Sequence, residues 1–496
     1  MVSTAAKSVT KNVAVLSFTR VITTSSTLVL MMFLPRCLGA VGYGRLYLGQ
    51  SIAGIFALLI EFGGNYSIMK AVAKNPEETA SIYVNSLGAR AFLWAASFTL
   101  MLGYAFAVGY PAEVILIVAI FGLGTLASGY NSVIGNCYRG ADLMKYPSYG
   151  AVSETVLTAA VGIAALLFGV GPVGYALIAV SGTVSASLVM TRFRPALFDS
   201  MPKVDWKKAV VLLKEGLPYF LNTVFGVIYY RIDTVMLSLM TPEQVVGWYA
   251  AAYRFFDSLM VVPVIFTVAV FPVMSRKWNT DSQAESLMLQ KSLDAIMMTA
   301  VPMAIGAFSF APEIIHLFFG RSSYEPSVLI LKIFSVGVVL LYIDFVLGTV
   351  LLSSDKQKAM SRTAFLAIFV NVGLNYLLIP FAQHSAGNGG IGSAIATLIT
   401  ELFVMINMLA LIPSRLFEHA RIGAQVKTLA SGVVMIIILE LLALASVTWV
   451  ASAALATASY AVSLLLMKTF TASDKALARS IIGRVNLRPG FSRAES

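Results

Sequence analysis

The residues with the clearest chemical potential are four charged side chains inside two apolar stretches between positions 217 and 274. Arg231 and Asp233 lie in the first stretch, and Arg254 and Asp257 lie in the second. A charge at membrane depth costs about 2.5 to 3.5 kcal/mol on insertion scales, so it faces a polar interior, pairs with an opposite charge or contacts a substrate. Two interpretations stay open: salt bridges that join the two helices, or a cationic wall that binds an anionic group such as phosphate.

Polar and small residues follow one face of the first stretch. Asn222, Gly226, Tyr230 and Asp233 fall at i, i+4, i+8 and i+11, a spacing that places them on one side of an α-helix. We expect this side to face the interior of a helix bundle or a cavity. Asn222 and Tyr230 therefore join the arginines as candidate substrate-binding residues.

Further charged residues lie in or near other apolar stretches. Arg20 and Arg45 are placed near helix ends, where an arginine commonly reaches toward the interface, but they also bring cations to the first half of the chain. For Glu401 and Glu440 we favour hydrogen-bonded anchors within their helices. The candidates for ion coupling or for structural charge pairing are Glu61, Glu154, Asp233, Asp257 and Asp344.

The elements that position these charges are membrane-spanning helices. Of the 496 residues, 58% are hydrophobic and 12% are charged, and the mean hydropathy is +0.83, far more apolar than a soluble protein. We predict an all-α polytopic membrane protein with about fourteen helices, since about 20 apolar residues span a bilayer. The predicted centres lie near Val29, Ala57, Ser97, Gly122, Ala160, Ala179, Val227, Val261, Thr299, Val339, Val370, Thr400, Ile436 and Ala456.

The positive charges test the direction of these helices. With a cytoplasmic N-terminus, nearly all of the 35 Lys and Arg residues fall in cytoplasmic connections or termini, as the positive-inside rule expects. On the outer face of the membrane, this topology places only Arg36, Arg45, Arg321 and Lys332. The formal net charge of +11 is therefore mostly a topology signal. We predict cytoplasmic termini and no nucleic-acid partner.

A polar connection after the sixth predicted helix divides the chain. The similar runs 41–44 (VGYG) and 246–249 (VGWY) lie on either side of it and indicate an internal repeat with both copies in one orientation. We predict two pseudo-symmetric six-helix lobes and a C-terminal helix pair. The predicted bounds are 1–190 for the N-terminal lobe, 191–213 for a basic cytoplasmic linker, 214–412 for the C-terminal lobe, 413–470 for the last helix pair and 471–496 for a basic cytoplasmic tail.

The sequence contains no convincing enzyme or cofactor motif. Residues 169–174 match G-x-G-x-x-G, but they lie between two apolar spans with no strand before them, and a P-loop motif is absent. Cys37 and Cys137 are predicted near opposite faces of the bilayer, which argues against a disulfide or a thiolate metal site. We expect no catalytic residues, no metal and no cofactor.

Two blocks of sequence resemble a known family. The first block reads YRIDTVML at 230–237, VGWYAAAYR at 246–254 and FPVMS at 271–275. The second reads NVGLNYLLIP at 371–380 and GIGSAIAT at 390–397. Together with the helix number and the lobe division, these blocks resemble the polysaccharide-transporter branch of the multidrug/oligosaccharidyl-lipid/polysaccharide (MOP) flippase superfamily.

The resemblance implies a V-shaped, two-lobed flippase in the cytoplasmic membrane of a prokaryote. Its substrate would be a polyprenyl-diphosphate-linked oligosaccharide, moved by alternating access for the assembly of a cell-surface glycan. Its partners would be this substrate, membrane lipids and glycosyltransferases or a polymerase of the same pathway. The implied diphosphate contacts are Arg20, Arg45, Arg231 and Arg254, and the implied sugar-stacking residues are Tyr229, Tyr230, Trp248 and Tyr249.

Two other functions compete with this interpretation. A multidrug or toxic-compound cation antiporter of the same superfamily would turn acidic groups toward its cavity, whereas arginines are at least as prominent here. A non-transporting membrane scaffold would hold glycosyltransferases through the basic tail from Lys468 onward. For that tail we favour a solvated segment that sets the topology.

Overall fold

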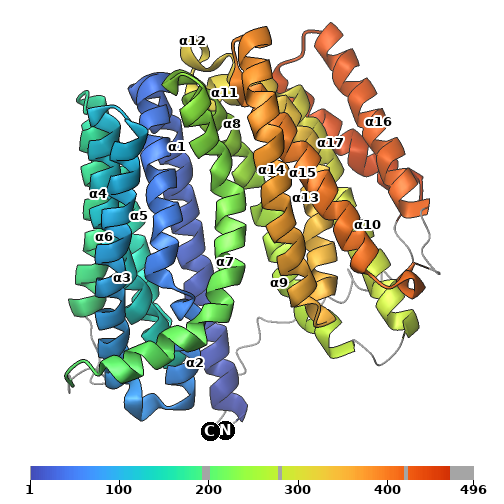
Figure 1. Ribbon diagram of the computed structural model, residues 1–496. Helices are drawn as coiled ribbons and strands as arrows, with labels where there is room; N and C mark the ends of the chain where they lie inside the picture. Colours follow the sequence, from blue (N-terminus) through green and yellow to red (C-terminus); the bar gives the residue numbers. More distant parts are fainter. Residues whose placement is uncertain (1, 193–201, 278–281, 418–422, 470–496) are drawn as a thin grey trace, which may run out of the picture. The chain divides into compact units, whose positions relative to one another are not determined.

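The described part of the chain is helical, which confirms the predicted all-α class. The computed structural model describes residues 2–192, 202–277, 282–417 and 423–469, and these residues contain no strand (Figure 1). The elements are α1 (Val2–Glu61), α2 (Gly64–Lys74), η1 (Pro76–Glu78), α3 (Thr79–Val108), α4 (Ala112–Gly140), α5 (Lys145–Leu167), α6 (Pro172–Arg192), α7 (Trp206–Met240), α8 (Glu243–Leu259), α9 (Val261–Lys277), α10 (Ser282–Ser309), α11 (Ala311–Phe319), α12 (Arg321–Tyr324), α13 (Ser327–Ser353), α14 (Gln357–Ala386), α15 (Gly389–Leu411), η3 (Ser414–Leu416), α16 (Gly423–Leu444) and α17 (Trp449–Leu466).

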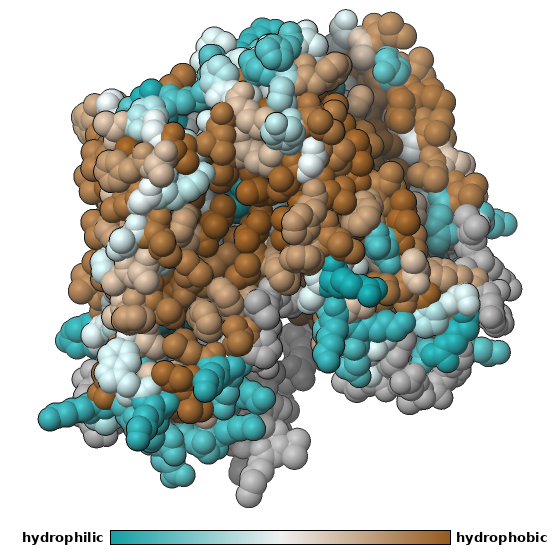
Figure 2. All heavy atoms as spheres, in the orientation of Figure 1, coloured by the Kyte–Doolittle hydropathy of each residue, from teal (hydrophilic) through white to brown (hydrophobic). Residues whose placement is uncertain are grey.

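The surface of these helices suits a lipid environment. Thirteen stretches of the described residues are long and apolar enough to cross a membrane. On α3, Phe92, Leu100 and Phe106 are exposed. Figure 2 shows hydrophobic residues along the sides of α3 to α6 and hydrophilic residues gathered at one end of these helices. Backbone groups within helices are satisfied internally, as hydrocarbon requires, and the protein is a multi-pass membrane protein.

The helix α1 consists of two arms joined at Gly39. Its apolar part, Phe18–Glu61, has 44 residues, about 66 Å if straight, roughly twice the hydrocarbon thickness. Thr27 and Ala57 would lie about 45 Å apart in a straight helix, yet both line one cavity. Gly39 has φ 66° and ψ 176°, which glycine adopts without a Cβ clash. The chain therefore turns back at Gly39. Division of α1 at this point turns the thirteen stretches found among the described residues into fourteen, which is consistent with the predicted number.

The helices group into two compact units. Unit 1 comprises Met1–Phe255, Ile314–Ile330 and Ser361–Thr400, and unit 2 comprises Phe256–Glu313, Leu331–Met360 and Glu401–Ser496. These units follow different boundaries from the predicted lobes, because unit 1 includes most of α8, most of α14 and half of α15, which the prediction assigns to the C-terminal lobe. The predicted lobes stay a prediction. The tail 471–496 lies outside the described residues, as does most of the first half of the predicted linker.

Each unit has its own apolar core. In unit 1, one cluster joins α2, α3, α4 and α6 around the buried Tyr138, and a second joins α1, α4, α5 and α6 around Ile117. In unit 2, a cluster joins α10, α16 and α17 around Ala456. Burial of apolar side chains stabilises a fold by about 25 cal/mol per Å² only where those side chains are exposed to water in the unfolded state. In a membrane, close packing and hydrogen bonds between helices carry more of the stability.

At one end of unit 1, the second arm of α1 packs directly against the start of α8. A Cβ atom on Gly247 would overlap the carbonyl oxygen of Ala40, and a Cβ on Gly44 would overlap the carbonyl oxygen of Glu243. The two glycine-containing runs that indicated a repeat thus contact each other through their backbones. Small residues permit this approach between helices. We call this contact, between residues 40–47 and 243–249, the seam.

Side chains from α1, α8 and α12 donate hydrogen bonds that reinforce the same end of unit 1. The Tyr324 hydroxyl donates a hydrogen bond to the Pro35 carbonyl at 3.0 Å. Arg36 donates to the carbonyl oxygen of His316 at 3.2 Å and also to that of Leu317. The indole of Trp248 donates to the Ser323 carbonyl at 2.8 Å, so this tryptophan has a structural hydrogen bond.

Candidate functional site

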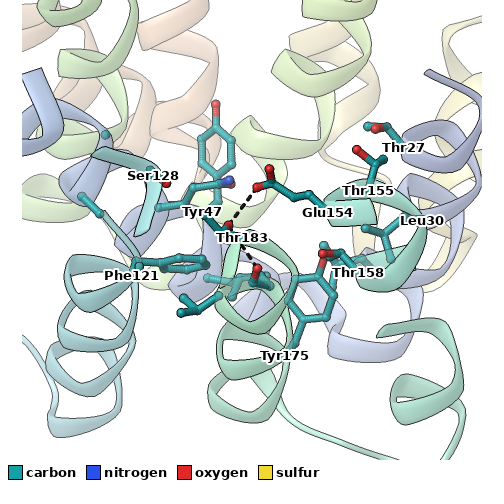
Figure 3. A pocket seen from close by; sticks show the side chains of 18 of the residues that line it. Thr27, Leu30, Tyr47, Phe121, Ser128, Glu154, Thr155, Thr158, Tyr175 and Thr183 are labelled. Carbon is teal, nitrogen blue, oxygen red and sulfur yellow. Dashed lines mark hydrogen bonds between the residues drawn. The ribbon is translucent and has the colours of Figure 1, made fainter. Parts of the chain in front are cut away.

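A cavity of about 480 Å³ lies within unit 1 (Figure 3). Both arms of α1 line it, together with α4, α5, α6 and one residue of α8. Its walls carry hydroxyl groups from Thr27, Tyr43, Tyr47, Thr125, Ser128, Thr155, Thr158, Tyr175 and Thr183. A hydroxyl both donates and accepts hydrogen bonds. The wall can therefore pair with the hydroxyls of a sugar as well as with water.

Glu154 is the acidic residue in the cavity wall. The Thr183 hydroxyl donates to Glu154 Oε1 at 2.8 Å, and Figure 3 shows these two side chains facing each other. This contact requires α5 and α6 to lie close together at Gly182, where a Cβ atom would overlap the Thr158 hydroxyl and approach the Glu154 carbonyl oxygen at 3.0 Å. Glu154 is thus held by a neutral donor rather than by a cation.

Arg254 is the residue of α8 that lines the cavity. It interacts electrostatically with Tyr43 and Tyr175, whose side chains are themselves buried. Asp257, three residues further along, is exposed. None of the ion pairs among the described residues includes Arg254. Its charge is therefore available to an anionic group that enters the cavity.

Arg231 lies next to the same tyrosines. Its Nη1 donates to the Tyr47 hydroxyl at 3.2 Å, and its guanidinium carbon lies 5.8 Å from the centre of the Tyr47 ring, within cation–π range. Tyr47 lines the cavity and packs against Tyr43, with ring centroids 6.3 Å apart. Arg231 therefore contacts the cavity wall, and aromatic and hydroxyl groups surround both arginines.

Arg45 has a different environment. Its Nε lies 2.6 Å from Glu243 Oε2, and its Nη1 forms an ion pair with Glu113. The triad joins α1, α4 and α8 beside the seam, and its three side chains are 27% to 34% exposed. The position of Arg45 relative to the interface stays a prediction, and its guanidinium is paired with two carboxylates.

Asp233 lies in a buried hydrogen-bonded cluster. Its carboxylate accepts hydrogen bonds from the hydroxyl of Tyr249 at 2.9 Å, the amide of Asn375 at 3.0 Å and the hydroxyl of Thr397 at 3.0 Å. Asn375 also donates to the side chain of Asn371 at 2.9 Å. The cluster thus joins α7, α8, α14 and α15 around one negative charge. No arginine takes part in it among the described residues.

This cluster bears on three expectations. The interpretation that Asp233 forms a salt bridge between the two helices is wrong, because uncharged groups from three other helices satisfy the carboxylate. Tyr249 is 1% exposed and bonded to Asp233, so it is not a sugar-stacking residue in this conformation. Tyr230, expected on the same face as Asp233, is 44% exposed whereas Asp233 is 3% exposed. Three residues differ by about 60° around a helix, which is enough to separate the two environments.

The other expected site residues lie in varied places. Arg20 is exposed on the first arm of α1. Glu61 accepts a hydrogen bond from the Asn65 amide at 3.1 Å. Tyr230 packs edge-on against Tyr229, with centroids 5.4 Å apart. The side chain of Asn222 lies outside the described residues. In unit 2, Asp344 is buried beside Glu401.

Several residues of the site were not singled out from the sequence. Thr183 and Tyr47 contact Glu154 and Arg231, while Asn375 and Thr397 contact Asp233. Asn375 and Thr397 belong to the second block of family resemblance, which gives them no role by itself. Polar residues repeated at i and i+4 within an apolar span, as Asn371 and Asn375 are, are the sequence signal for such a cluster.

Comparisons with known proteins give consistent findings. A family model described as "Polysaccharide biosynthesis protein" matches residues 9–278, and one described as "Lipid II flippase MurJ" matches residues 248–471. Two curated proteins of Haloferax volcanii are similar. "Probable low-salt glycan biosynthesis flippase Agl15" is 21% identical over 229 residues, 45% of this chain and 47% of that protein. "Probable flippase AglR" is 25% identical over 223 residues, 44% and 45% of the two chains. The chain thus spans about half the length of the curated relatives it matches.

Solved structures share the fold. An inward closed conformation of lipid II flippase MurJ superposes with a TM-score of 0.72 at 13% identity, covering 95% of this chain and 99% of that chain. An inward-facing multidrug resistance MATE family transporter of the MOP superfamily superposes with a TM-score of 0.66 at 17% identity, covering 83% and 100%. At these identities the likeness concerns the fold alone. The proteins found by all three comparisons are flippases and transporters rather than catalytic enzymes.

Proposed function

We propose that this chain moves a polyprenyl-diphosphate-linked oligosaccharide across the cytoplasmic membrane of a prokaryote by alternating access. The premise is that the chain belongs to the polysaccharide biosynthesis protein family, among the flippases of the MOP superfamily. A glycan head group cannot cross hydrocarbon unaided, because each unsatisfied polar group costs several kcal/mol there. The polyprenyl tail can stay in the bilayer while the head group passes through the protein. Enzymes that assemble or polymerise the glycan are the partner class that this proposal implies.

The observation that carries the proposal is the pairing of hydroxyls and an unpaired arginine in one cavity. The hydroxyl wall offers hydrogen bonds that suit a sugar. Arg254 and, beside it, Arg231 offer the planar donors that bind phosphate oxygens in a bidentate manner. We assign the diphosphate to these two arginines. Arg45 receives a structural role because Glu113 and Glu243 neutralise it, and Arg20 is exposed outside the cavity.

The seam supports a proposal about the side of the membrane from which the substrate enters. The predicted topology places residues 40–47 and 243–249 at the outer face, with both termini cytoplasmic. The seam closes that end of unit 1 by direct backbone contact. We interpret this arrangement as the state of the transport cycle in which the outer end is closed. The substrate then enters from the cytoplasmic leaflet, and the seam separates in the opposite state.

Asp233 is our candidate for ion coupling. Its cluster holds one negative charge among neutral amide and hydroxyl groups, and Asn375 Oδ1 is buried without a hydrogen-bond donor. Oxygen ligands of this kind suit a hard cation, and a single carboxylate matches a monovalent one such as Na⁺. Because the cluster joins α7, α8, α14 and α15, a cation bound there would stabilise one arrangement of these four helices. Sodium would then bias the conformational equilibrium.

A transport assay with ion replacement tests this role of Asp233. In vesicles, flipping by the unaltered chain should be faster in sodium chloride than in potassium chloride, and Asp233→Asn should remove the difference. Asp257→Asn is the matched control, because Asp257 is an exposed acid on α8 and should keep the sodium effect. Equal sodium stimulation in unaltered chain and Asp233→Asn would refute the assignment.

The main experiment reconstitutes purified protein into vesicles with a polyprenyl-diphosphate oligosaccharide in both leaflets. An impermeant glycosidase that acts on the outer head groups reports how fast inner head groups arrive. Replacing Arg231 and Arg254 by Ala should slow arrival by about tenfold or more, because a hydrogen bond to a charged group contributes about 1.5 to 3 kcal/mol. Arg20→Ala should leave the rate nearly unchanged.

The result separates the flippase from its nearest competitor. A cation antiporter gains support from one observation, the presence of Glu154 in the cavity wall. That function predicts efflux of a cationic dye that Glu154→Gln removes and that the arginine variants leave intact. Normal head-group arrival in the double arginine variant, with correct folding, would refute the arginine assignment. Dye efflux without any head-group arrival would favour the antiporter.

A further inference from the structure

Two acidic side chains lie next to each other in the interior of unit 2. Asp344 on α13 is 7% exposed, and Glu401 on α15 is 4% exposed. Both occupy the middle of stretches that are apolar enough to cross a membrane, Ser327–Ser353 and Gly389–Leu411. A buried carboxylate is normally paired with a cation or with several donors, because burial penalises the charged form.

Neighbouring acids in unit 2 follow that rule. Glu285 is 5% exposed and lies 3.3 Å from the guanidinium of Arg415. Asp294 is 6% exposed and accepts a hydrogen bond from the amide of Gln425 at 2.6 Å. Asp344 differs from both, since neither of its carboxyl oxygens receives a hydrogen bond from any described donor.

The group that faces Asp344 is another acceptor. The Glu401 carboxyl is the charged group that acts on it, and the two interact directly. Two ionised carboxylates bring only acceptor oxygens and like charges to the same place. A proton on either one supplies the missing donor, turns repulsion into an O–H···O bond and halves the charge that must be buried. Like carboxyl groups in close contact share a proton for this reason.

We propose that Asp344 and Glu401 form a proton-binding site that holds one exchangeable proton between them. Binding converts two carboxylates into one carboxylic acid hydrogen-bonded to one carboxylate, and the pair changes from two negative charges to one. Release returns the proton to water and leaves a repelling pair that favours separation of α13 and α15. The site deepens the proposed transport function by supplying a proton-sensitive step, but its existence does not depend on which substrate is moved.

Infrared spectroscopy of the purified chain in lipid, without substrate, tests the site directly. The carboxylic C=O band should persist at neutral pH, where ordinary Asp and Glu side chains are ionised with pKa values of about 3.9 and 4.3. The band should shift in D₂O and should disappear reversibly at alkaline pH. Asp344→Asn and Glu401→Gln should each remove it, because an amide donor then satisfies the remaining carboxylate.

Asp294→Asn is the matched control, a buried acid of the same unit that already has a donor, and it should keep the band. Thermal unfolding of each variant in detergent verifies the fold. Absence of the band in the unaltered chain, or its survival in both pair variants, would overturn the proposal. Loss of the band on adding sodium chloride at constant pH, with no effect of potassium chloride, would overturn it in favour of a sodium site. Failure of head-group transport alone would affect only the proposed function.

Discussion

Arg45 and Arg254 are both partly buried arginines of unit 1, but their neighbours differ. Arg45 lies beside the seam between two carboxylates from other helices, Glu113 and Glu243. Arg254 lines the cavity among tyrosines and is part of no described ion pair. An arginine whose charge is already neutralised stabilises the contact between its helices. An arginine without a carboxylate partner is suited to bind an anionic ligand.

The same distinction applies to the surroundings of each arginine. Around Arg45, glycines bring two backbones into direct contact, and the cavity of about 250 Å³ that Arg45 lines also contains its ion-pair partner Glu243. Around Arg254, hydroxyl groups line open space. One unit thus contains two kinds of arginine environment: the seam holds helices together, and the cavity is the proposed binding site for a polar head group. Changes to the seam should affect stability first, and changes to the cavity should affect transport first.

The largest effect on stability is expected from Gly247→Ala. The new Cβ atom overlaps the Ala40 carbonyl oxygen, and overpacking of this kind costs about 1 to 3 kcal/mol. Thermal unfolding in detergent should show a clear loss of stability. Gly103→Ala is the control, since its Cβ atom would meet no atom beyond its own stretch of helix within 4 Å and alanine favours the helix. Equal stability of both variants would contradict the close backbone contact at the seam.

A smaller effect on stability is expected from Arg45→Ala. It leaves Glu113 and Glu243 facing each other without a cation, at a place where both are about one-third exposed. Partial exposure screens the repulsion, so we expect a loss of about 1 kcal/mol. Arg254→Ala should leave the unfolding temperature nearly unchanged while it slows head-group transport. If Arg254→Ala destabilised the chain as much as Arg45→Ala does, the distinction between the two arginines would not hold.

The fold was largely predictable because membrane helices satisfy their backbone within one segment. Length and hydropathy place such a segment without knowledge of its neighbours. The exception in α1 illustrates the limit. Its two arms were predicted as separate helices, but the turn at Gly39 consists of a single residue with positive φ, and no polar loop marks it in the sequence.

The site was less predictable because its contacts join distant segments. The donors to Asp233 lie 16, 142 and 164 positions away along the chain, and helical periodicity relates only residues of one helix. The sequence therefore indicated Asp233 and Arg231 as important but left open a salt bridge that Asp233 does not form. Arg45 shows the same limit, because its carboxylates come from 68 and 198 positions away.

The make-up of the seam has a kinetic consequence. Where side chains interlock, two helices separate only after many rotamers have rearranged, and that requirement slows the motion. At Gly44 and Gly247 the touching surfaces are bare main chain, which has no rotamers to change. We expect the two helices to separate as rigid bodies once the ion pairs of Arg45 are broken. They should return to the same register each time. Two helices that meet in this way can separate and close repeatedly and restore the same contact.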